Sequence, residues 1–300
     1  MEYHAHNFKD SSLLFFEEDV LVAILPANIK DYCLYAHGGL TFGDLFYNHQ
    51  NDAALNAQII ASLKEFFNSH EIEKIIFKPL PKFLSSQSNL NMPIDISCYF
   101  NLQPKRQEIN LVIPDSKLIN VQQRRKRGYK KALEAQLKFG ESENWLDFWQ
   151  VLSKNLWERH NCYPVHTYRE ICYLRDRFPK NIKLFAATSH GKILAGTVVY
   201  FYPNKVAHCQ YLANTPLGRK KGALDFVIFE LQKYLKYEYK ISLGVSTLRK
   251  TMGVNQGLYD WKAGFGAIPH LHEIQEIEVK NLRPQNNTFA NKNTFIYVAH

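Results

Sequence analysis

Residues 206–235 read VAHCQYLANTPLGRKKGALDFVIFELQKYL. The first part, 206–214, alternates in the manner of a β-strand, and the last part, 223–235, places apolar side chains at helical spacing. Between them stands Gly218-Arg219-Lys220-Lys221-Gly222, a turn that joins two glycines to three consecutive cations. A strand that leads through such a turn into a helix directs N–H groups and the positive end of the helix dipole at one place. The stretch therefore predicts a phosphate-binding turn.

This turn matches neither G-x-G-x-x-G nor G-x-x-x-x-G-K-[ST], so it is neither a dinucleotide-binding loop nor a P-loop. An ordinary strand-to-helix turn with water-facing cations is the alternative. The chain has 300 residues, 46% of them hydrophobic, which is enough for one large domain or two of ordinary size. A net charge of +9 favours an anionic ligand. Because the cations are spread over most of the chain, nucleic acid is the second possibility.

Five scattered cysteines without a C-x-x-C pair indicate reduced thiols in a cytoplasmic protein, with neither disulfides nor a metal site. The N-terminus lacks the basic-then-apolar order of a signal peptide. The apolar run from Leu13 to Leu25 is interrupted by Glu17-Glu18-Asp19 and is too short to span a bilayer. We therefore expect a soluble protein without membrane insertion.

Periodicity and turn residues predict the remaining elements. The expected strands are 12–16, 20–26, 31–38, 74–77, 94–102, 183–188, 193–201, 206–214, 241–245 and about 273–279, and the expected helices are 52–68, 116–137, 145–159, 168–178, 223–235 and 257–263. The order β-β-β-α-β thus occurs twice, from Ser12 to Phe77 and from Lys183 to Val245. This recurrence predicts two tandem α+β units, in residues 1–117 and 118–300, the first degenerate because its turn has no cations.

The helix expected at 116–137 carries dense cations, among them Arg124, Arg127 and Lys131. A solvated helix face is the ordinary interpretation of such a run. The run could also line an anion-binding site for the pyrophosphate of a substrate. Arg124 and Arg127 would then contact that pyrophosphate. A nucleic-acid-binding protein built on this helix is the competing class, but it leaves the repeated pattern and the glycine-bounded turn without a purpose.

Several segments together carry a resemblance to a known family. Arg219-Lys220-Lys221-Gly222 matches the first half of the pattern Q/R-x-x-G-x-G/A, although Leu224 stands where Gly or Ala is expected. The other segments are HGGLTFG (37–43), Arg159-His160, PVHT (164–167), QYL (210–212), GALD (222–225), NQGL (255–258), Lys262 and GFG (264–266). The chain resembles the GCN5-related acetyltransferase (GNAT) fold in the doubled arrangement of its FemAB-like branch. Ala263 replaces a typical Glu, which excludes a role for that carboxylate.

The resemblance implies transfer of an acyl group from coenzyme A to an amine. The most similar subgroup is the sugar-nucleotide N-acyltransferases of bacterial surface-polysaccharide pathways such as O-antigen or capsule. Their acceptor would be a dTDP-linked 3-amino-3,6-dideoxyhexose and the acyl group acetyl or a short hydroxyacyl. The FemAB-like enzymes that use aminoacyl-tRNA are the alternative. Those typically have a long helical hairpin, and this sequence has no heptad-like stretch of that length.

The resemblance also implies roles for residues. Backbone groups of Tyr211, Leu212 and Ala213 would bind the acyl carbonyl and pantetheine. The remaining cofactor contacts would come from Gly218, Arg219, Lys220, Lys221, Gly222, Ala223 and Asn255. Substrate contacts are expected from Arg159, His160 and Lys262, beside Arg124 and Arg127.

The catalytic base has three candidates, His37, His166 and His208, since histidine titrates near neutral pH. A structural histidine is the ordinary interpretation of each, and the amine could also lose its proton to water. Asp225 is interpreted as a carboxylate that stabilises the start of its helix. A nucleophilic Cys209 is the other enzymatic possibility, but alternation places it on the face opposite His208, and no neighbouring sequence activates it.

Overall fold

The computed structural model describes residues 5–47, 53–84, 103–116, 120–248, 253–279 and 294–298. Two compact units form: unit 1 comprises Met1–Glu108 and Leu271–His300, and unit 2 comprises Ile109–His270. The sequence predicted a boundary at residue 117 and assigned the whole C-terminal part to the second domain. Leu271–His300 instead groups with unit 1, because β13 (Ile268–Glu278) pairs with β6 (Lys74–Phe77) of that unit.

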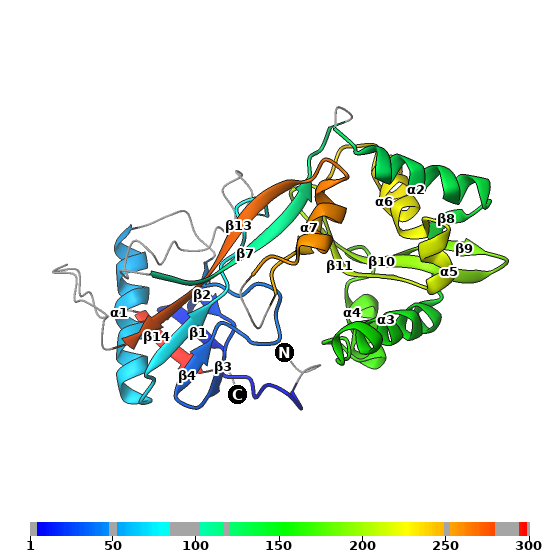
Figure 1. Cartoon of the computed structure of the whole chain (residues 1–300). Coiled ribbons are helices and arrows are strands. Elements are labelled where there is room, and N and C mark those ends of the chain that lie inside the picture. The colour runs from blue at the N-terminus through cyan, green and yellow to red at the C-terminus, as the bar shows by residue number, and fades with distance from the viewer. Residues whose placement is uncertain are drawn as a thin grey trace. The chain divides into compact units, whose positions relative to one another are not determined.

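The described part of unit 1 contains two groups of strands and one long helix (Figure 1). β1 (Leu13–Glu17) and β2 (Val20–Leu25) form an antiparallel sheet with β5 (Phe46–Tyr47) and β14 (Thr294–Val298), in the order β14-β1-β2-β5. The second group runs β3 (Asn28–Lys30), β4 (Cys33–Tyr35), β6 and β13. Helix α1 (Ala53–Ser69) shares a core with both groups, which includes Phe15, Leu34, Ile59, Phe67 and Phe77.

The strand predicted at 31–38 is wrong, because a hairpin turn interrupts it. Asp31 and Tyr32 have φ angles of 51° and 56° and join β3 to β4, whose residues Lys30 and Cys33 pair. Two consecutive left-handed residues make the turn that matches strand twist, and Asn-Gly is its usual signature. The dipeptide Asp31-Tyr32 is not typical of this turn, so the sequence did not predict a hairpin here. The strand predicted at 94–102 lies outside the described residues.

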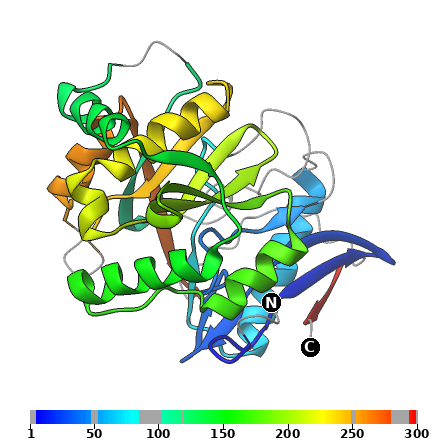
Figure 2. The same cartoon turned by 90° about the vertical axis from the view of Figure 1, so that its right-hand side faces the viewer.

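Unit 2 is a sheet with helices on both faces. The strand order is β7 (Gln103–Ile113), β12 (Lys240–Val245), β11 (Val206–Asn214), β10 (Lys192–Tyr202), β9 (Ile182–Ser189) and β8 (Lys138–Glu141). Helices α2 (Gln123–Glu134) and α6 (Ala223–Tyr234) lie over one face of β9–β11, and α3 (Trp145–His160) and α4 (Tyr168–Arg177) over the other (Figures 1 and 2). Two shorter helices, α5 (Pro216–Lys220) and α7 (Gln256–Ala263), complete the unit.

The fold is the predicted α+β class, with mostly antiparallel sheets flanked by helices. Among the described residues, each unit contains a parallel crossover around a helix: β4, α1 and β6 in unit 1, and β11, α6 and β12 in unit 2. In both units the parallel strands pair over three residues. The tandem recurrence is therefore present at the crossovers. The strand count differs from the prediction, since five short strands precede α1.

Candidate functional site

The first feature of the site is the separation of two parallel strands in unit 2. β11 and β12 pair from Val206 with Lys240 to His208 with Ser242, where their ladder ends. On its other edge β12 continues along β7, with a register shift between Ser242 and Val245. Gly244 within this shift has φ +74°, a conformation that favours glycine. Beyond His208 and Ser242 the ladder between β11 and β12 therefore ends within the described residues, whereas β12 remains paired with β7 as far as Val245.

A second bulge lies on β11 at the same level. Its register against β10 shifts between Val198 opposite Tyr211 and Val199 opposite Cys209, which makes Gln210 the extra residue. A bulge turns backbone groups out of the ladder. The backbone from Gln210 onward therefore lies at an edge outside the β11–β12 ladder, where N–H groups can meet a developing oxyanion. This segment contains Tyr211, Leu212 and Ala213, the residues expected to bind the acyl carbonyl.

Three buried polar side chains occupy the narrow end, where the two strands still pair. His208 Nδ1 lies 2.9 Å from Ser242 Oγ. Lys262 of α7 donates from Nζ to the carbonyl oxygens of Gly244 and Val245, at 2.9 and 2.7 Å. Lys262 is only 3% exposed, and burial lowers its pKa to about 7. Lys262, expected only as a substrate contact, is thus the group at this end that can exchange a proton near neutral pH.

The neighbouring groups titrate far from neutrality. Burial, helped by the nearby charge of Lys262, lowers the pKa of His208 to about 4, so its imidazole is neutral at pH 7 and a weak base. Burial raises the pKa of the Cys209 thiol to about 11. A thiol with that pKa carries almost no thiolate at pH 7, which argues against Cys209 as a nucleophile.

His166 is brought to β11 by a capped helix. Thr167 caps α4 through a capping box with Glu170, which ends the preceding loop at a defined position. His166 is buried, its Nδ1 lies 2.6 Å from Tyr211 Oη, and its backbone N–H donates to the same oxygen at 3.3 Å. The ring of Trp149 packs edge-on against Tyr211. His166 thus contacts the strand expected to bind the donor.

His37 belongs to unit 1 and takes part in a turn. Its Nδ1 accepts a hydrogen bond from the N–H of Gly39 at 3.2 Å, its φ is 47°, and its ring packs against Phe8. The side chain is buried. These contacts are those of a histidine that orders the glycine turn, and a catalytic role for it stays a prediction.

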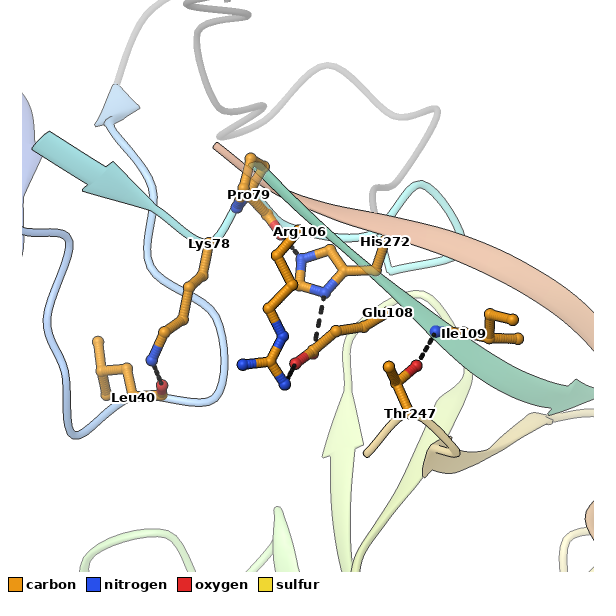
Figure 3. Close-up of polar contacts among 8 residues, drawn as sticks. All are labelled: Leu40, Lys78, Pro79, Arg106, Glu108, Ile109, Thr247 and His272. Atoms are coloured by element: carbon orange, nitrogen blue, oxygen red, sulfur yellow. Dashed lines mark hydrogen bonds and ion pairs between the residues drawn. The ribbon is translucent and has the colours of Figure 1, made fainter. Parts of the chain in front are cut away.

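A polar network in unit 1 holds the end of the same turn (Figure 3). Arg106 Nη2 pairs with Glu108 Oε1 at 2.8 Å, and Glu108 Oε2 lies 3.8 Å from Nδ1 of the buried His272. His272 donates from Nε2 to the carbonyl oxygen of Pro79 at 2.8 Å, while Lys78 Nζ lies 3.5 Å from the carbonyl oxygen of Leu40. The network joins β7, β13 and the end of β6, so it explains how this polar sheet face is held together.

The predicted phosphate turn is a short helix. Thr215 caps α5 by accepting from the Gly218 N–H at 2.9 Å, and the N–H groups of Arg219 and Lys221 bond to carbonyls of the same turn. These amides are therefore used within α5, which corrects the expectation that they are available to phosphate. The first hydrogen bond of α6 runs from Phe226 N–H to Gly222. A phosphate site here would rest on the cationic side chains and the first turn of α6, which begins at Ala223.

The helix with the dense cations is docked by one of them. Arg125 is buried and donates to Asp225 Oδ1 at 2.6 Å, and Trp261 Nε1 donates to the same oxygen at 2.9 Å. Asp225 therefore ties α2, α6 and α7 together, a role beyond the helix-start carboxylate expected from the sequence. Burial raises the pKa of Asp225, and the charge of Arg125 opposes that shift. Arg124 and Arg127 are exposed on α2.

Other residues that were predicted to contact the cofactor or substrate lie at the surface or cap a helix. Arg159 and His160 are exposed at the end of α3. Lys220 is exposed, and Arg219 reaches Asn155 Oδ1 at 3.3 Å. Asn255 caps α7 by accepting from Leu258 N–H, which explains it without a cofactor.

No protein-family model matches the chain, and no curated protein matches it. The C-terminal domain of a putative lysylphosphatidylglycerol synthetase from Agrobacterium fabrum is similar in structure, with a TM-score of 0.58, 13% identity, and coverage of 88% of this chain and 83% of that one. FemX is similar with a TM-score of 0.57 and 12% identity, over 91% of this chain and 89% of that one. L-PGS from Bacillus licheniformis has a TM-score of 0.57 and 11% identity, over 92% of this chain and 86% of that one. The chain has the fold of these proteins. The resemblance to the FemAB-like branch is confirmed at the level of the fold, whereas the sugar-nucleotide subgroup stays a prediction.

Among the described helices, none combines the length and the apolar character needed to cross a membrane.

Proposed function

We propose that the protein transfers an acyl group from coenzyme A to an amine at the separation of β11 and β12 in unit 2. The observation that carries this proposal is Lys262, a buried lysine with a pKa of about 7 at the narrow end of the separated strands. Amine acylation needs donors for the oxyanion and a group that accepts a proton at working pH. Backbone N–H groups at the Gln210 bulge provide the donors for the oxyanion, and Lys262 provides the proton acceptor.

The contacts of Lys262 suit a neutral amine. An uncharged ε-amino group has two N–H donors and one lone pair, and among the described residues Lys262 donates to the carbonyls of Gly244 and Val245. The lone pair then remains to accept a proton. In the proposed step the acceptor nitrogen bonds to the carbonyl carbon, the carbon–sulfur bond breaks, and Lys262 takes the amine proton and returns a proton to the departing thiolate.

The acceptor that we propose is a nucleotide-linked amino sugar. Support comes from the sequence resemblance, the net charge of +9 and the exposed cations of α2, since both donor and acceptor would carry a pyrophosphate. A second candidate is aminoacyl transfer. It is favoured by the shared fold of FemX and of a protein named for the synthesis of lysylphosphatidylglycerol.

Coenzyme A binding tests the donor. Replacing Arg219, Lys220 and Lys221 by Ala should weaken coenzyme A by about 1–3 kcal/mol in calorimetry, because charge-assisted contacts are lost. Ala variants of Lys126, Lys130 and Arg127, which are exposed cations on α2, are the matched control. Equal affinities of the two triple variants would refute the phosphate site at α5.

Turnover tests Lys262. With acyl-CoA and a dTDP-amino sugar, Lys262→Met should lower kcat about 10²–10⁴-fold and remove the acidic limb of the pH profile near pH 7. His166→Ala and His208→Ala are compared in the same assay. If Lys262→Met keeps kcat within a few-fold, its proton-transfer role is wrong. Acylation by aminoacyl-tRNA but not by acyl-CoA would establish the second candidate.

The exposed cations of α2 separate acceptor binding from nucleic-acid binding. Charge reversal at Arg124 or Arg127 should raise the KM of the nucleotide sugar and leave that of acyl-CoA nearly unchanged. Tight retention of DNA at physiological salt, falling steeply as salt rises, would instead support the nucleic-acid class.

A further inference from the structure

Asn155 of α3 joins three elements of unit 2 through one carboxamide. Its Nδ2 donates to the carbonyl oxygen of Val151 at 3.0 Å and to that of Asn214 at 2.6 Å. Its Oδ1 accepts from Nη1 of Arg219 at 3.3 Å. Asn214 is the last residue of β11, and Arg219 belongs to α5. The side chain therefore links α3, the end of the strand expected to bind the donor, and the predicted phosphate turn.

The two carbonyl partners fix the orientation of this amide. A carbonyl oxygen can only accept a hydrogen bond, so the NH₂ group must face Val151 and Asn214. The amide oxygen of Asn155 then faces the guanidinium of Arg219. Only a carboxamide offers donors on one side and an acceptor on the other, since aspartate has no donor and leucine has neither.

Arg219 is held in place without losing its charge. Its Nη1 also lies 3.5 Å from Oδ1 of Asn214, so two neutral amide oxygens share one end of the guanidinium. A guanidinium has five N–H donors, and within the described residues no carboxylate pairs with Arg219. By contrast, the surface cation Lys183 pairs with Glu141 at 2.8 Å. Arg219 therefore keeps its full charge and most of its donors for an anion from outside the chain.

The two neighbouring cations lack such an arrangement. Among the described residues, no side chain forms a hydrogen bond or ion pair with Lys220 or Lys221, so both ammonium groups are free to adopt many rotamers. A guanidinium fork matches two phosphate oxygens, and a group that is already oriented loses less entropy on binding. Resting on the proposed function, we propose that Asn155 is a positioning residue that orients Arg219 to bind a phosphate group of the coenzyme A donor.

A double-mutant cycle with the full chain tests this coupling. Calorimetry should show coenzyme A bound roughly 10-fold more weakly by Arg219→Met and roughly 5-fold more weakly by Asn155→Leu. In the Arg219→Met background, Asn155→Leu should have no further effect, because a positioning residue acts through the group that it orients. Additive effects of the two substitutions would overturn the inference.

Asn155→Asp tests the importance of a neutral acceptor. This variant keeps an oxygen for Arg219 but adds a negative charge, which competes with phosphate for the guanidinium. It should weaken coenzyme A at least as much as Asn155→Leu does. Wild-type affinity in Asn155→Asp would contradict the inference.

Asn181→Leu is the matched control for a purely structural role. Asn181 also donates from Nδ2 to a strand carbonyl, that of Phe201 at 3.1 Å, and its Oδ1 binds no cation among the described residues. Both Leu variants should lower the Tm by a few degrees, since each loses a hydrogen bond between elements. Only Asn155→Leu should weaken coenzyme A. An equal loss of affinity in Asn181→Leu would show that destabilisation alone explains the effect.

Three probes separate the inference from the function on which it rests: coenzyme A, dephospho-coenzyme A and inorganic pyrophosphate. If Asn155→Leu weakens the first two equally, Arg219 binds the pyrophosphate of the donor; a loss confined to coenzyme A assigns the 3′-phosphate. If pyrophosphate binding depends on Asn155 but coenzyme A does not bind, the donor is wrong and the phosphate site stands. If coenzyme A binds equally well to wild type and Asn155→Leu, the donor stands and the inference is wrong. Binding of none of the three overturns both.

Discussion

Lys262 should make the stability of unit 2 rise with pH, which is the direction opposite to that of an ion-paired lysine, whose pKa is raised. Its pKa is about 7 in the folded protein and its ordinary value is 10.5. Below pH 7 the folded and unfolded states both hold the proton. Between pH 7 and 10.5 the folded state has released it and the unfolded state has not. The unfolded state then binds more protons, so stability rises with pH across this window.

The size of the effect makes it measurable. A full proton difference changes the free energy of unfolding by about 1.4 kcal/mol per pH unit, or about 3 kcal/mol between pH 7.5 and 9.5. This is a large fraction of the 5–15 kcal/mol that is typical of a domain. In Lys262→Met the contribution is absent, so the difference between wild type and variant should grow by that amount as the pH rises. Other titrating groups cancel in the difference.

Tryptophan fluorescence provides the assay. All four tryptophans, Trp145, Trp149, Trp157 and Trp261, belong to unit 2, so their emission in guanidinium reports the unit that holds Lys262. Lys130→Met is the matched control, because its side chain is 78% exposed. Its stability should follow that of the wild type at every pH. Parallel curves for wild type and Lys262→Met, within about 0.5 kcal/mol, would refute the lowered pKa and with it the proton-transfer role.

Three further predictions concern the packing around α6. Gly222→Ala should lower the Tm by several degrees, since its φ is +69° and a Cβ there would lie 2.1 Å from a backbone oxygen of α2, whereas Gly140→Ala, with no atom within 4 Å, should change it little. Arg125→Met should cost about 3–5 kcal/mol in guanidinium unfolding, because it leaves the carboxylate of Asp225 buried without its cation; a loss below 1 kcal/mol would contradict that reasoning. Cys209 should resist Ellman's reagent at pH 8 in the folded protein and react after unfolding, and mass spectrometry of the labelled native protein would reveal a failure.

Local patterns predicted most elements of unit 2. The strands β9, β10 and β11 and the helices α3 and α4 occur within a few residues of their expected positions, because alternation, helical spacing and turn residues are properties of adjacent amino acids. The sequence also predicted the crossover recurrence, which follows from the order of elements. It did not predict β7, β8 or β14, whose partners are distant in the chain, nor the break between α5 and α6, where Thr215 caps a short extra helix.

The sequence by itself thus determined the fold class and the tandem recurrence, and it predicted the segment of β11 at which we propose the site. Only the tertiary structure decided which side chains have the right chemistry. Lys262 is one lysine on a helix in the sequence, and only its burial in the folded protein lowers its pKa. Likewise Arg125, one cation in a dense run, is distinguished by a carboxylate that follows it 100 residues later. Desolvation and charge pairing depend on surroundings in space, and residues far apart in the sequence supply them.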